Sequence, residues 1–201
     1  MDLKIYDEIE NIIMEFEREI QINKAIILNE SDFKCQLYRQ LYTFNEIKET
    51  SDYGILGNQI HTEIKFYDDN NQLKLIPDIT IIETRNLSIL KSIEVKVVNG
   101  ENINSKLPSK QYQFSGNSTI FELKYVRNKK GITSRNINSF QKDIDKINNL
   151  QNLNFPNGND IYGVFLILNK TNLKNVNFEN FINENSSEKL KIIYLTQNVI
   201  F

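Results

Sequence analysis

Three charged side chains in apolar, β-type segments are the residues best suited to chemistry. Asp78 interrupts an otherwise apolar run, and Glu122 and Lys124 alternate with the apolar residues of a second run. Strand residues at positions i and i+2 face the same way, so Glu122 and Lys124 are expected on one face. A carboxylate in an apolar strand is costly unless something pairs with it, and a bound cation can do so. Two carboxylates, a hard cation and a lysine can together support hydrolysis of a phosphodiester.

The hydrophobic periodicity predicts the helices and strands that must position these groups. Apolar residues at helical spacing indicate an amphipathic helix over roughly residues 3–22 and a second helix that opens at Ser31 or Asp32. Period-two patterns then predict a hairpin, and later segments of helix and strand follow. The expected segments are strands 61–67, 73–82, 86–98 and 119–126, a helix from Asn138 or Ser139, strand 161–168, a short helix containing Phe178 and Phe181, and strand 191–195.

This order predicts an α/β protein with a mixed central β-sheet flanked by helices. A chain of 201 residues with 40% hydrophobic residues suits a single domain, 1–201, with one core. Within it we expect N-terminal helices over residues 1–50, a catalytic core over 59–170 and a C-terminal helix and strand over 171–201.

Composition narrows the class of protein. Lys and Arg number 24 against 26 Asp and Glu, and this net charge of −2 is not the bulk basicity of a protein that coats nucleic acid. The single cysteine, Cys35, excludes an internal disulfide and favours a reducing compartment. No apolar run approaches the length that spans a membrane. We therefore expect a cytoplasmic protein without a membrane partner.

The pattern resembles the PD-(D/E)xK nuclease superfamily, which includes type II restriction endonucleases. Pro77-Asp78 matches the first half of the motif of that superfamily, and Glu122-Leu123-Lys124 matches the second half. The segment from Asp143 to Ile147 is similar to the helix that follows this motif, and residues 161–168 resemble the next strand. The resemblance covers roughly residues 25–170 and implies a restriction-endonuclease-like core of the order α-β-β-β-α-β.

By this resemblance, Asp78 and Glu122 bind Mg²⁺ or Mn²⁺ with help from the backbone carbonyl of Leu123. Lys124 orients or activates the attacking water and stabilises charge on the phosphate.

Two further carboxylates are candidates for the same site. Many relatives contribute a glutamate from the first core helix, and Glu30 is the best-placed residue of that kind here. Glu63 precedes Pro77-Asp78 in the predicted hairpin. A solvated surface position fits either residue as well as a role in the site does.

A second Glu-x-Lys sequence leaves the motif open to another assignment. Glu94 and Lys96 lie closer to Asp78 along the chain, also in a β-type run. We prefer Glu122 because the expected helix and buried strand follow it directly. On this assignment residues 84–118 form an inserted hairpin and loop.

Cationic residues follow the Lys124 strand, namely Arg127, Lys129, Lys130 and Arg135. Beside a metal site they would suit contacts with phosphates, and the alternative is an ordinary solvated loop.

The expected function is that of a metal-dependent endonuclease acting on DNA, in restriction or in defence against mobile DNA. Relatives often pair as homodimers, which makes a second copy of the chain a candidate partner. The alternative is a non-catalytic module that binds nucleic acid or protein and retains the nuclease fold.

Overall fold

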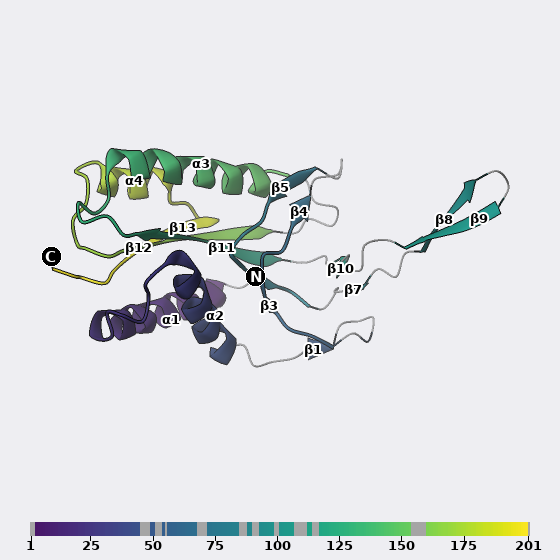
Figure 1. Ribbon diagram of the computed structural model, residues 1–201, viewed down its shortest axis with the longest axis horizontal. Helices are drawn as coiled ribbons and strands as arrows, with labels where there is room; N and C mark the ends of the chain where they lie inside the picture. Colours follow the sequence, from purple (N-terminus) through teal and green to yellow (C-terminus); the bar gives the residue numbers. More distant parts are fainter. Residues whose placement is uncertain are drawn as a thin grey trace.

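A five-stranded sheet forms the centre of the protein in the computed structural model (Figure 1). The structure describes residues 3–44, 49–50, 54, 56–67, 72–84, 88–89, 93–98, 101–106, 112–113, 117–153 and 160–200. The strand order is β13-β12-β11-β6-β3. The strands are β3 (Ile60–Thr62), β6 (Ile79–Ile82), β11 (Ser118–Val126), β12 (Ile161–Asn169) and β13 (Leu190–Thr196). β11, β12 and β13 run parallel, whereas β6 is antiparallel to both β11 and β3.

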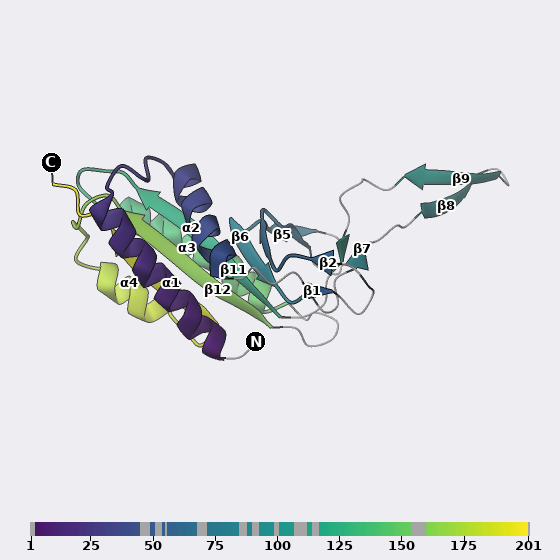
Figure 2. The same ribbon diagram turned by 90° about the horizontal axis from the view of Figure 1, so that it is seen from below.

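Helices cover both faces of this sheet (Figures 1 and 2). They are α1 (Leu3–Ile22), α2 (Glu30–Phe44), α3 (Ser134–Gln151) and α4 (Phe178–Asn185). Figure 1 shows α1 and α2 on one face and α3 and α4 on the other. The predicted α/β class with a mixed, helix-flanked sheet is confirmed.

Two apolar clusters lie on opposite faces of the sheet. Phe121 and Leu123 of β11 belong to the cluster that includes α1 and α2. Ile120 belongs to the cluster that includes α3 and α4. Strand alternation therefore directs Glu122 and Lys124 toward the α3 face. β12 is buried on both faces, which accounts for its nearly continuous apolar sequence.

The predicted hairpin of residues 61–67 and 73–82 forms as two short ladders with a break between them. β4 (Phe66–Tyr67) pairs with β5 (Leu73–Leu75), and β3 pairs with β6. Pro77 lies in the break and has no backbone N–H to donate to a ladder. Opposite it, Glu63 has a φ of 56°, which is uncommon for a residue other than glycine. The break places Asp78 immediately before β6.

Both predicted helix starts near the site were wrong. The side chain of Asn29 accepts a hydrogen bond from the Asp32 amide at 2.9 Å, which makes Asn29 the N-cap of α2 in place of Ser31 or Asp32. α3 begins at Ser134, ahead of the predicted Asn138 or Ser139, because Thr133 and Asn136 form a capping box.

The strands between β6 and β11 do not join the central sheet in the described residues. β7 (Ser88–Ile89) pairs with β10 (Tyr112–Gln113), and β8 (Ile93–Val98) pairs with β9 (Glu101–Lys106). The β8–β9 hairpin projects away from the central sheet in both views (Figures 1 and 2). A further small pair, β1 (Glu49–Thr50) with β2 (Leu56–Gly57), follows α2.

Candidate functional site

Asp78 is attached to the middle of β11 by its backbone and its side chain. Its amide donates to the Phe121 carbonyl at 3.0 Å, and its carboxylate accepts from the Leu123 amide at 2.9 Å. These two bonds go to the residues on either side of Glu122, just past the last ladder pair, Ile79 with Phe121. Asp78 and Glu122 are therefore neighbours at the point where the β6–β11 ladder stops and β11 continues.

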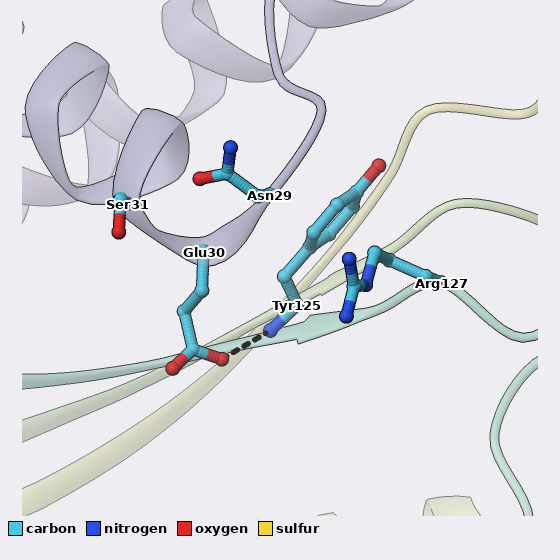
Figure 3. A pocket seen from close by; sticks show the side chains of 5 residues that line it. All are labelled: Asn29, Glu30, Ser31, Tyr125 and Arg127. Carbon is cyan, nitrogen blue, oxygen red and sulfur yellow. Dashed lines mark hydrogen bonds between the residues drawn. The ribbon is translucent and has the colours of Figure 1, made fainter.

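The ladder between β6 and β11 ends at Phe121. Beyond it, the N–H and C=O groups of every second β11 residue point to that same edge. The N–H and C=O of one strand residue point to the same edge, so the Leu123 carbonyl lies on the side of Asp78. Two residues further along, the Tyr125 amide donates to the Glu30 carboxylate at 3.3 Å (Figure 3). The carboxylates of Asp78 and Glu30 thus accept the hydrogen bonds that a neighbouring strand would otherwise accept along this edge.

Lys124 lies between two carboxylates on the α3 face. Its ammonium is 2.8 Å from Glu122 and 2.8 Å from Asp143 of α3. Asp143 is also 2.7 Å from Lys146, one helical turn further along α3. The side chains of Glu122 and Asp143 are each only 15% exposed, so solvent screens these interactions weakly.

The charges around Glu122 are not balanced. Burial raises the pKa of Glu122; the nearby Lys124 lowers it, Asp78 and Asp143 raise it further, and the net pKa lies above the ordinary value. Burial lowers the pKa of Lys124, but its two carboxylate partners outweigh burial and hold it above the ordinary value. The pKa of Glu122 rises mainly through burial, which its one lysine does not offset, and the pKa of Lys124 rises because two carboxylates hold it. Lys124 is consequently a cation at neutral pH.

A second ion cluster reaches Asp78 from α2. Lys34 of α2 is 2.7 Å from the Glu63 carboxylate and 3.9 Å from the Asp78 carboxylate. The hydrogen bond with Glu63 raises the pKa of Lys34, and burial only partly opposes it. The same bond lowers the pKa of Glu63.

The charged side chains around Asp78 form a row in which the sign of the charge alternates, except where two carboxylates are adjacent. The row runs Glu63, Lys34, Asp78, Glu122, Lys124, Asp143, Lys146. The two adjacent carboxylates are Asp78 and Glu122, and the charge of Asp78 raises the pKa of Glu122. One cation between them would complete the alternation.

The donor set at this position suits a divalent cation of the Mg²⁺ type. Carboxylate and backbone carbonyl oxygens are hard ligands, and Asp78, Glu122 and Leu123 supply both kinds. Within the described part of the chain, no three His, Cys, Asp or Glu side chains gather as a metal-binding group. The candidate set is thus two carboxylates and one carbonyl, which leaves room for water and substrate oxygens.

The other predicted residues have different partners. The Glu63 carboxylate contacts Lys34, and the Glu30 carboxylate accepts a hydrogen bond from the Tyr125 amide. Neither forms a three-carboxylate group with Asp78 and Glu122. Glu94 and Lys96 lie on β8, which pairs with β9 and not with β6.

The cationic residues after β11 are exposed. They are Arg127, Lys129, Lys130 and Arg135. Arg127 lines a shallow pocket of about 390 Å³ at the first turn of α2, together with Tyr125, Asn29, Glu30 and Ser31 (Figure 3). The start of α2 and Arg127 therefore meet at one end of β11.

Sequence reasoning missed two residues of the site. Asp143 lies in the apolar stripe of Phe140, Ile144 and Ile147, and a carboxylate in such a stripe signals a buried partner. Lys34 has no comparable local signal, because its partners come from a break in a ladder on other strands.

No protein-family model matches the chain, and no curated protein or solved structure shows significant similarity to it. Across the described residues, no helix combines the length and apolar character needed to cross a membrane.

Proposed function

We propose that the protein is a metal-dependent nuclease of the PD-(D/E)xK kind, with Asp78, Glu122 and Lys124 as its catalytic residues. The observation that carries this proposal is the interrupted charge row, in which the neighbouring carboxylates of Asp78 and Glu122 stand between two lysines. The order α2, β3, β6, β11, α3, β12 supports it, because it matches the helix, three strands, helix and strand of a restriction-endonuclease-like core.

Asp78, Glu122 and the Leu123 carbonyl would hold Mg²⁺ or Mn²⁺. When bound, the cation supplies Lewis-acid activation of water and stabilises charge on the phosphate. Water attack forms a new P–O bond and breaks the ester P–O bond, and a water proton ends on the leaving oxygen. Lys124, held protonated by Glu122 and Asp143, acts as a fixed positive charge that orients the water and stabilises the pentavalent phosphate.

DNA is the proposed substrate class, and the cationic segment after β11 is its proposed track. Arg127, Lys129, Lys130 and Arg135 follow the strand that carries Glu122 and Lys124, so a phosphate chain crossing the site could reach them. A homodimer would let two such sites cut both strands. The lone cysteine agrees with action in the reducing cytoplasm.

The test is cleavage of plasmid, single-stranded DNA and single-stranded RNA with Mg²⁺ or Mn²⁺. We expect the wild type and Lys191→Ala to cut DNA, and Asp78→Ala and Lys124→Ala to lose at least about 100-fold in rate. Lys191 is a matched control, since it pairs with Glu10 at the opposite edge of the sheet. Equal rates in all four proteins would refute the mechanism. Binding of DNA without cleavage by the wild type would support the non-catalytic module instead.

A further inference from the structure

Lys34 extends from α2 to the first half of the proposed motif. Its ammonium lies 2.7 Å from Glu63 and 3.9 Å from Asp78, and its side chain is 22% exposed. It thus approaches Asp78 from α2, whereas Lys124 is held by Asp143 of α3. The distance to Asp78 exceeds hydrogen-bonding range, so the charge acts on Asp78 while the closest contact is with Glu63.

Glu63 is held by this contact and not by burial. Its side chain is 64% exposed, and its backbone has a φ of 56° at the break in the hairpin. The Glu63 amide points to the Asp78 carbonyl at 3.4 Å, so the strained residue and the proposed metal ligand are direct neighbours. A residue other than glycine is strained in this region, and such strain is typically found at functional sites.

We propose that the Lys34 ammonium balances the charge of Asp78 and so competes with the divalent cation for that carboxylate. Glu63 weakens this competition by holding Lys34 away from Asp78. The inference rests on the proposed function only through the cation site, and does not depend on the substrate.

The signs of the two effects follow from charge. A cation bound at Asp78 is repelled by the nearby ammonium, so removal of Lys34 strengthens cation binding. Removal of the Glu63 charge leaves Asp78 as the nearer remaining carboxylate for Lys34. The ammonium then moves onto Asp78 and weakens cation binding.

The experiment measures Mn²⁺ binding to the protein without nucleic acid, from the electron paramagnetic resonance signal of the free ion. For Lys34→Met we expect the dissociation constant to fall roughly three- to tenfold, and for Glu63→Gln to rise by a similar factor. The double variant should match Lys34→Met, because Glu63 acts through Lys34. Lys191→Met, which removes an ion-paired lysine between α1 and β13, should leave Mn²⁺ binding unchanged. Lys34→Gln and thermal unfolding of every variant guard against an effect of misfolding.

The Mn²⁺ measurements distinguish failure of the role assigned to Lys34 from failure of the cation site itself. If the wild type binds Mn²⁺ and Lys34→Met binds it equally or more weakly, the inference is wrong and the cation site stands. A double variant that binds more weakly than Lys34→Met would make Glu63 a direct contributor to the cation site and overturn its assigned role. Wild-type protein without Mn²⁺ binding would overturn both. Mn²⁺ binding with the expected signs but no DNA cleavage would leave the inference intact and remove the nuclease.

Discussion

The ammonium of Lys124 lies 2.8 Å from the carboxylate of Asp143, which belongs to α3 and not to the strand of the proposed motif. This contact fixes the lysine from outside its own strand. If Glu122 turns toward a cation, Asp143 still holds Lys124 in place. Asp143 is therefore a positioning residue for the proposed reaction.

Asp143→Asn should slow DNA cleavage about 10- to 100-fold, the usual effect of losing a partner that orients an active-site group. Mn²⁺ affinity should fall far less than the cleavage rate, because Asp143 contributes negative charge near Glu122 and is not among the proposed ligands. Asp145→Asn is the matched control, since Asp145 is exposed on the same helix and accepts from Gln141. A parallel loss of Mn²⁺ affinity in Asp143→Asn would place Asp143 among the ligands instead.

The raised pKa of Glu122 predicts how stability depends on pH in the absence of a cation. Burial and the nearby Asp78 and Asp143 raise this pKa despite Lys124. A group with a raised pKa in the folded state gives its full stability below the unfolded value of about 4.3 and loses it as pH rises through the folded value. Glu122→Gln should thus be more stable than the wild type at pH 7, with the difference vanishing below about pH 4.

Asp143 gives the opposite pH dependence and serves as the comparison. Burial raises its pKa, but hydrogen bonds from Lys124 and Lys146 outweigh burial and lower it. Its contribution is present above the ordinary aspartate value and is lost as pH falls through the folded value. Asp143→Asn should be less stable than the wild type at pH 7. Chemical unfolding across the pH range checks both signs, and Mn²⁺ should reduce the advantage of Glu122→Gln.

Local periodicity accounts for the part of the site that the sequence predicted. Alternation places Glu122 and Lys124 on one face whatever their neighbours are, and helical spacing predicted α1 over its full range. Asp143 was within reach of the same reasoning, because it interrupts an apolar helical stripe.

Non-local pairing accounts for the part that the sequence could not supply. Glu122 and Glu94 have the same local pattern, and only the choice of partner strand separates them. The contacts of Lys34 depend on where one ladder ends and another begins. The predicted start of α2 was wrong for a local reason. Asn29, Ser31 and Asp32 are all good N-caps, and these residue types differ little in N-cap preference.

Gly131 should tolerate no side chain. A Cβ built there would lie 1.8 Å from the Leu173 carbonyl oxygen, and the φ of the residue is 67°. Gly131→Ala should lower the free energy of unfolding by about 2–4 kcal/mol, through backbone strain and displacement of the Leu173 segment. Gly54 has a φ of 72° with nothing within 4 Å of such a Cβ, so Gly54→Ala should cost only about 1 kcal/mol. If urea unfolding gave the same loss of unfolding free energy for Gly131→Ala and Gly54→Ala, the close approach of the Leu173 carbonyl would not be what makes Gly131 intolerant.

The cationic segment after β11 should control the salt dependence of DNA binding. Combining Arg127→Ala with Lys130→Ala should weaken binding and reduce the slope of log K against log salt by roughly one for each phosphate that is no longer neutralised. Lys189→Ala is the control, because this exposed lysine pairs with Asp160 away from the segment. Wild-type slopes in the double variant, measured by fluorescence anisotropy, would identify the segment as an ordinary solvated loop.

The two Glu-x-Lys sequences can be separated by paired double substitutions. β8, which carries Glu94 and Lys96, pairs with β9 outside the central sheet, whereas β11 pairs with β6 directly beside Asp78. Glu94→Ala with Lys96→Ala should therefore keep cleavage within about twofold of the wild type, while Glu122→Ala with Lys124→Ala should abolish it. Both double variants remove one acid and one base, so net charge is unchanged. Loss of cleavage in the first, with Mn²⁺ binding and thermal unfolding intact, would mean that the hairpin contributes to catalysis by contacting the substrate. Loss of Mn²⁺ binding in the first would instead transfer the second half of the motif to β8.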